Sequence, residues 1–120
     1  MYTYSFEKLL VWQNAKELTK HLYSITKSFP KEEKFGLTSQ LRRASISIAS
    51  NIAEGSSRKS KKDQAHFTVI AFSSAVEVLN QVIICFDLEL ITEADYEVLR
   101  MQIEKITNQL NALRNSQINS

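Results

Sequence analysis

The clearest helical pattern in the chain lies in residues 92–113, TEADYEVLRMQIEKITNQLNAL. Its apolar side chains recur alternately after three and four residues, which aligns them along one face of an α-helix. They are Tyr96, Leu99, Ile103, Ile106, Leu110 and Leu113. Thr92 followed by Asp95 is typical of an N-terminal cap with an acid in the first turn. We therefore expect a helix over residues 93–114, with residues 115–120 frayed.

Three earlier segments predict helices by the same periodicity, at residues 9–29, 36–54 and 61–88. The first should end before Pro30, because proline disfavours helical geometry in the preceding residue and has no N–H to donate. Gly55 stands where a left-handed C-terminal cap would end the second. Ser60 with Asp63 repeats the N-terminal cap pattern and opens the third.

The composition supports a helical domain. Only two glycines and one proline occur in 120 residues, too few for the many turns of an all-β protein. The chain has the length of one domain, and short connections between long helices force neighbours to run antiparallel. We therefore predict an all-α fold, with residues 1–120 forming a single antiparallel up-down-up-down four-helix bundle.

No segment predicts secretion or a membrane span. The N-terminus has no basic stretch followed by an apolar block. Residues 65–88 are strongly apolar, but four polar side chains that are costly in lipid interrupt them. These are Glu77, Asn80, Gln81 and Asp87. The lone Cys85 can form no internal disulfide, so we expect a cytoplasmic protein that makes no contact with a membrane.

The segment 61–88 carries more apolar surface than one bundle is expected to cover. Either one central helix has a wide buried face, or a second subunit covers the excess. We expect the second, a homo-oligomer whose interface includes Val69, Phe72, Val76, Ile83 and Phe86. The small side chains of residues 44–53 could admit another helix, although packing within the chain against Trp12 or Phe67 is favoured.

The charge is uneven along the chain. Residues 1–62 carry twelve basic and five acidic side chains, and residues 63–120 carry three and eight, so the two halves are +7 and −5. Six of the basic residues predict a positive corner that contacts the phosphates of RNA or DNA. They are Arg42, Arg43, Arg58, Lys59, Lys61 and Lys62. Alternatively, they keep the protein soluble or pair with the acids of residues 93–114 in the same or a neighbouring subunit. No aromatic residues interleave with them, so we expect contact mainly with the nucleic-acid backbone.

The sequence offers no catalytic or metal site. His21 and His66 are the only histidines, and neither has a carboxylate or cysteine at metal-ligand spacing. We expect no enzyme activity, catalytic residue, metal or cofactor. A remote alternative is a metal-free nuclease with His66 as general base and Arg58 as phosphate clamp. A nearer alternative is a protein-only adapter or scaffold without a nucleic-acid role.

Four motifs occur in order, FEKLLVWQ (residues 6–13), FGLTSQLRR (35–43), NIAEG (51–55) and RKSKK (58–62). Together they resemble the four-helix-bundle proteins encoded in 23S ribosomal RNA intervening sequences, over residues 6–113. Relatives of that family include the accessory variability proteins of diversity-generating retroelements, pentameric barrels that bind nucleic acid and a reverse transcriptase. The resemblance implies a homo-pentamer, with structured RNA or DNA and a reverse transcriptase or another protein as partners. It places phosphate contacts on the QLRR and RKSKK motifs.

The NIAEG motif is expected to serve the fold. Gly55 would cap the helix, and Asn51 and Glu54 would bond the exposed backbone of the turn. Recognition of a partner by this motif is the alternative.

Overall fold

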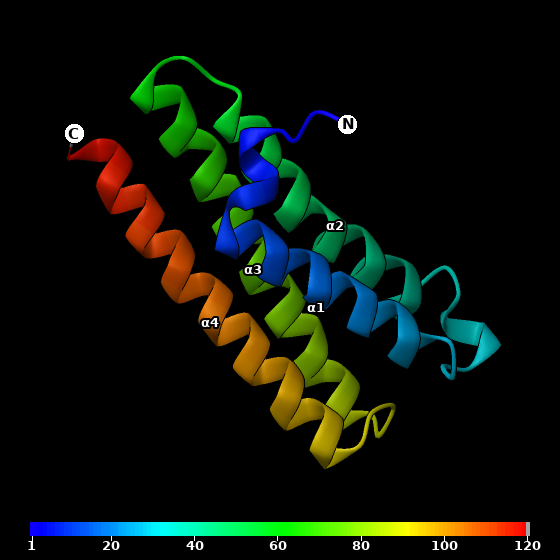
Figure 1. Ribbon diagram of the computed structural model, residues 1–120. Helices are drawn as coiled ribbons and strands as arrows, with labels where there is room; N and C mark the ends of the chain where they lie inside the picture. Colours follow the sequence, from blue (N-terminus) through cyan, green and yellow to red (C-terminus); the bar gives the residue numbers. More distant parts are fainter. Residues whose placement is uncertain (120) are drawn as a thin grey trace.

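A computed structural model describes residues 1–119 and shows four long helices joined by short connections (Figure 1). The helices are α1 (Leu10–Thr26), α2 (Leu37–Ser56), α3 (Lys61–Asp87) and α4 (Glu93–Ile118). Two short 3-10 helices, η1 (Ser5–Lys8) and η2 (Lys31–Glu33), precede α1 and α2. Residues 1–119 contain no strand, so the prediction of an all-α fold with four helices is confirmed.

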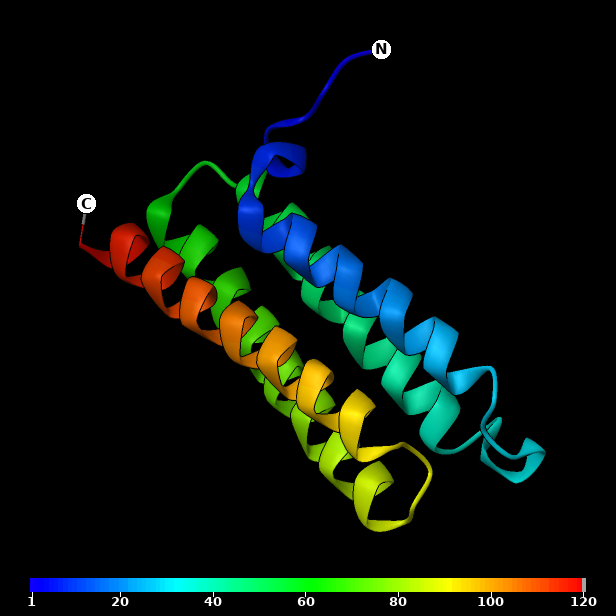
Figure 2. The same cartoon turned by 60° about the horizontal axis from the view of Figure 1, so that its bottom comes forward.

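The four helices lie side by side, and each runs opposite to the one before it (Figures 1 and 2). α3 packs against α2 and α4, while α1 packs against α2 and more lightly against α4. The N-terminal segment, the α2–α3 connection and the end of α4 lie at the same end of the molecule. α3 is long and apolar enough to cross a membrane by length and composition, but here it is a central packing helix.

The core is built from the predicted stripes. In α4, Leu99, Ile103, Ile106 and Leu110 are fully buried, and Tyr96 and Leu113 pack at the edge of the core. The other helices contribute buried leucine, isoleucine and valine in the same manner. These include Leu18, Leu22, Leu41, Ile48, Val78 and Val82. The spacing of apolar residues therefore identified the inward faces of the helices.

Two helix ends differ from prediction by three residues or more. α1 ends at Thr26, three residues early, because the amides of Ser28 and Phe29 turn back to carbonyls only three residues behind them. α4 continues to Ile118, where fraying was expected. The Thr68 hydroxyl on α3 donates to Gln117 Oε1 at 2.8 Å, and this buried bond fixes the last turn of α4. Ser120 lies outside the described residues.

The predicted left-handed cap at Gly55 is wrong. Among the described residues no glycine has a positive φ, and Gly55 is a buried residue inside α2. A Cβ added there would stand 2.9 Å from Cβ of Phe67, so the glycine allows α2 to approach α3 closely. The Asn51 amide donates to the Ser47 carbonyl one turn earlier, at 2.8 Å, so it does not bond the turn as expected.

Candidate functional site

The connection between α2 and α3, together with the first turn of α3, displays four basic side chains, which we call the basic loop. They are Arg58, Lys59, Lys61 and Lys62. Two side-chain hydrogen bonds help to hold its backbone. The Ser60 hydroxyl accepts from the Asp63 amide at 3.1 Å, which confirms the predicted cap, and Gln64 Nε2 donates to the Arg58 carbonyl at 2.8 Å. The loop therefore presents its cations from a defined backbone conformation.

All four side chains of the basic loop are exposed, and none forms an ion pair with an acid among residues 1–119. Within residues 1–119, the ion pairs shorter than 4.0 Å are Lys20 with Glu17 at 3.5 Å and Arg43 with Glu77 at 2.6 Å. The alternative in which these cations pair with acids of α4 therefore does not occur within the described part of the chain. Their charge is directed to solvent, where it attracts anions.

Two of these cations stand where they weaken the helix. Lys61 and Lys62 occupy the first turn of α3, at the positive end of the helix dipole. An exposed charge of the wrong sign there costs on the order of 0.3–1 kcal/mol at low salt. Arg58 is placed by a cation–π contact, with its guanidinium carbon 4.6 Å from the centroid of the Phe67 ring. Helix stability therefore does not explain this concentration of charge.

The structure does not bring Arg42 and Arg43 together with the basic loop. They lie near the start of α2 (Leu37–Ser56), about 20 Å along the helix axis from its end. Arg42 Nε donates to Thr26 Oγ1 at 3.0 Å, and its guanidinium lies 4.4 Å from the centroid of the Tyr23 ring. Arg42 thus fastens α2 to α1.

Arg43 is engaged on the other side of α2. Its guanidinium donates to Glu77 Oε2 at 2.6 Å and to Gln40 Oε1 at 2.8 Å. This ion pair joins α2 to α3 and neutralises the arginine. The predicted corner of six cations therefore divides into two arginines that join α2 to its neighbouring helices and the four residues of the basic loop. The sequence motif QLRR did not show which residues its arginines contact.

The predicted oligomer interface also divides. Val69 and Val76 on α3 are 43% and 47% exposed. Phe72, Ile83 and Phe86 are partly buried within the chain. The Phe86 ring stacks on Tyr96 of α4 with 4.4 Å between centroids, so one face of the ring is already covered within the chain.

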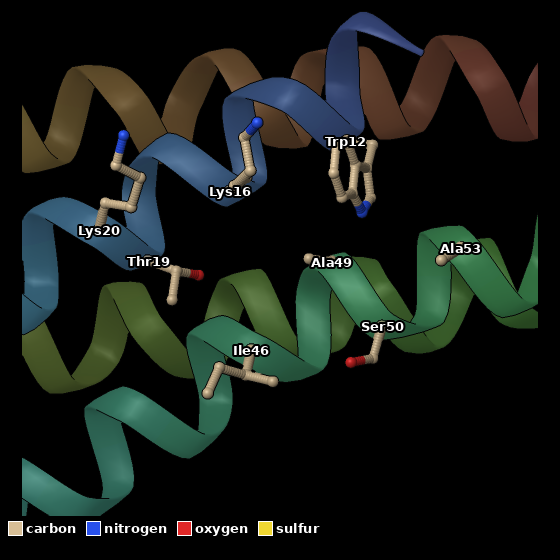
Figure 3. A pocket seen from close by; sticks show the side chains of 8 residues that line it. All are labelled: Trp12, Lys16, Thr19, Lys20, Ile46, Ala49, Ser50 and Ala53. Atoms are coloured by element: carbon tan, nitrogen blue, oxygen red, sulfur yellow. The ribbon is translucent and has the colours of Figure 1, made fainter. Parts of the chain in front are cut away.

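A shallow groove of about 300 Å³ separates α1 from α2 (Figure 3). The indole of Trp12 lies between the two helices, facing the small side chains of Ala49 and Ala53, while Lys16 and Lys20 turn away from α2. Lys16 Nζ is 5.0 Å from the centroid of the Trp12 ring. The small residues of α2 therefore face a large one of the same chain along this part of the helix.

An aromatic cleft that the sequence did not predict adjoins the basic loop. Tyr2, Tyr4 and Phe6 line it together with Ser56 and Ser57, the residues just before the loop. Aromatic side chains therefore reach the residues that directly precede the basic loop, a contact that the sequence did not predict. Their spacing at every second residue near the N-terminus was the available signal, but about 50 residues separate them from the loop along the chain.

The remaining chemically active side chains have packing roles. His21 Nδ1 is 2.8 Å from Gln102 Oε1, and the His66 ring packs edge-on against Phe67. Burial raises the pKa of the Cys85 thiol to about 11, with a contribution from Glu33, so the thiol stays protonated and unreactive at neutral pH. Within residues 1–119, no three histidine, cysteine or acidic side chains are grouped to hold a metal ion.

Two comparisons find proteins similar to this chain. The model of the 23S rRNA-intervening sequence protein family matches residues 7–112. The crystal structure of a protein of unknown function from the S23 ribosomal protein family of Bacteroides thetaiotaomicron superposes with a TM-score of 0.78. That alignment covers 87% of this chain and 97% of that one at 22% sequence identity, a likeness that speaks to the fold alone. No curated protein matches the chain.

Proposed function

Because this chain belongs to the 23S rRNA-intervening sequence protein family, we propose that it is a non-enzymatic, oligomeric antiparallel bundle that binds the backbone of RNA or DNA. The observation that carries the proposal is the basic loop, which has four exposed cations in five residues and no acid paired with them among the described residues. A cytoplasmic location fits this role, and it requires no cofactor.

The chemistry of the basic loop suits phosphate. Lysine and arginine displace the counterions condensed on nucleic acid, so affinity falls steeply as salt rises. Such contacts fix the position of the protein on a strand but carry little sequence information. In an oligomer, each copy would add another basic loop, which multiplies the attraction.

The proposal contains no catalytic step. Arg58 and His66, the pair that a metal-free nuclease would use, both pack against the ring of Phe67. Packing against Phe67 therefore accounts for the positions of Arg58 and His66 without a catalytic role. A second protein, such as the reverse transcriptase implied by the resemblance, is a compatible further partner.

Replacing Arg58, Lys59, Lys61 and Lys62 together with glutamine should reduce the affinity for RNA and DNA by at least about tenfold at roughly 50 mM salt. The dependence of affinity on salt should also become shallower, because fewer counterions are released. The variant should unfold at the same temperature as the wild type or slightly higher, because two lysines leave the positive end of α3. Fluorescence anisotropy and thermal circular dichroism measure these effects.

A matched control removes the same charge from elsewhere. Lys27, Lys31, Lys34 and Lys105 are exposed and lie outside the basic loop, so their replacement by glutamine should leave most of the affinity in place. Equal losses in both variants would mean that net charge matters and the basic loop does not. A wild-type protein that binds neither RNA nor DNA at low salt would contradict the proposal and favour the protein-only adapter.

The proposed homo-oligomer is supported by Val69 and Val76, which expose apolar surface on α3. Val69 also lines a groove of about 260 Å³ between α3 and α4, with Phe72 and Leu110. This apolar surface would be covered in an assembly. The expectation that the oligomer has five subunits rests on the family resemblance alone.

Replacing both Val69 and Val76 with aspartate should convert the oligomer to monomers at micromolar concentration, because buried charges without partners oppose association. Helical content should persist, since both side chains are exposed in the single chain. Sedimentation velocity measures the change, and Val98→Asp, at a similarly exposed site on α4, is the control. A wild-type protein that sediments as a monomer would rule the assembly out.

A further inference from the structure

Exposed aromatic rings border the basic loop. Tyr2, Tyr4 and Phe6 line a cleft of about 430 Å³ with Ser56 and Ser57, and Arg58 follows directly in the chain. Figure 2 shows the N-terminal segment at the same end of the bundle as the α2–α3 connection. The fold therefore brings the N-terminal aromatic side chains to the residues that directly precede the basic loop.

The rings form a connected series anchored to the core. Ring centroids are 5.0 Å apart between Tyr2 and Tyr4, 6.2 Å between Tyr4 and Phe6, and 5.0 Å between Phe6 and Trp12. Trp12 is partly buried and packs against the core. The Tyr4 amide donates to Glu7 Oε2 at 2.8 Å, which fixes the backbone. The series therefore has a defined inner end.

The outer rings are open to ligands. Tyr2 is 76% exposed and Tyr4 is 61% exposed, so both rings present accessible surface to solvent. Aromatic rings next to cations match the alternation of base and phosphate along a single strand of nucleic acid. In a duplex the faces of the bases are stacked on one another, so they are closed to such rings.

We infer that the aromatic cleft and the basic loop together form a site for unpaired nucleotides of RNA or DNA. The bases stack on Tyr2 and Tyr4, and the phosphates lie against the basic loop. This inference rests on the proposed function and specifies its substrate class, a single strand.

The charge within the cleft agrees with this division. Glu54 lines the cleft, and a carboxylate repels phosphate. The cleft is thus better suited to bases, while phosphates are drawn toward the basic loop. Ala53 lines both this cleft and the α1–α2 groove, so the surface continues to Trp12 and its neighbour Lys16. A strand longer than one nucleotide can therefore follow a continuous path.

The test compares Tyr2→Leu/Tyr4→Leu with the wild type, because leucine keeps apolar volume but removes the π-face. The probes are single strands of about 15 nucleotides, oligo-dT and oligo-U, and a duplex of the same length. We expect the variant to lose about tenfold or more in affinity for single strands while its affinity for the duplex is unchanged. The two single strands distinguish DNA from RNA as the preferred source of the unpaired bases.

Phe35→Leu is the matched control. Phe35 is an exposed aromatic residue with a lysine ammonium 5.4 Å from its ring centroid, but it lies at the opposite end of α2. Its replacement should leave the affinity for single strands unchanged, and circular dichroism should show the same helical content in all three proteins. A general effect of aromatic residues would appear in this control.

Three results would overturn the inference. If the tyrosine variant binds single strands as tightly as the wild type, the rings do not stack on bases, and duplex binding that depends on the basic loop still upholds the proposed function. If it loses single-strand and duplex affinity equally, the segment acts only on the shape of the loop. If the wild type binds no nucleic acid, the proposed function fails as well.

Discussion

Replacing Ile106 with alanine should lower the free energy of unfolding by about 2–5 kcal/mol. Ile106 is fully buried in the stripe of α4 that faces the other helices. The loss combines the apolar surface removed from the core with the cavity that rigid neighbours leave open. Total stability of a small domain is on the order of 5–15 kcal/mol, so this variant would be close to unfolding.

Urea denaturation followed by circular dichroism measures this loss. The protein concentration must be held constant, because association would add to apparent stability. Met101→Ala is the control, since Met101 is on the same helix but 71% exposed, and its replacement should change stability by less than about 0.5 kcal/mol. Similar losses in both variants would contradict the assignment of the inward face of α4.

Replacing Gly55 with alanine should also destabilise the protein, against the usual trend. In a helix interior, alanine is ordinarily better than glycine by about 1 kcal/mol. Here the new methyl group would lie 2.9 Å from Cβ of Phe67, an atom fixed to the backbone of α3. The two helices would have to separate, and overpacking of this kind costs about 1–3 kcal/mol. Gly55→Val should have a larger effect.

Gly36→Ala provides the comparison for this second variant. A Cβ at Gly36 would stand 3.0 Å from Glu33 Oε1, the movable end of a side chain. A rotation of the Glu33 side chain would therefore relieve the close contact. Thermal unfolding of the two variants should therefore show a clearly lower midpoint for Gly55→Ala than for Gly36→Ala. An increase in the midpoint of Gly55→Ala would show that α2 and α3 are not in such close contact.

The helices could be predicted because their determinants are local. The three-and-four spacing of Leu99, Ile103 and Ile106 fixes a buried face before any partner is known. Ser60 and Thr92 cap the amides of residues three positions later, so their roles were also readable in sequence. The confirmed features depend on residues within a few positions of one another.

The features that were mispredicted depend on residues far apart in the chain. The last turn of α4 is held by the bond between Thr68 and Gln117, and Gly55 is explained only by Phe67. Similarly, the sequence showed the charge of Arg43 but not its ion pair with Glu77. Local patterns contain no information about such partners.

The candidate site was predictable in part. The exposed cations of the basic loop were identified from their density in five residues. Arg42 was wrongly grouped with them, because a count of charges along the chain does not take into account the length of α2 that separates them. The approach of Tyr2 and Tyr4 to Ser57 required the tertiary fold, because η1 is set against the end of α2 by packing.

The shared location of the chain's beginning, the α2–α3 connection and the final turn of α4 bears on how the protein should be handled. Because the four helices alternate in direction, the last helix ends at the same end of the molecule at which the first helix begins (Figure 1). An affinity tag or fluorophore fused to either terminus would crowd the tyrosines and lysines whose ligand is sought. Reporter groups belong on the turn between α3 and α4, around Glu89, at the remote tip of the molecule.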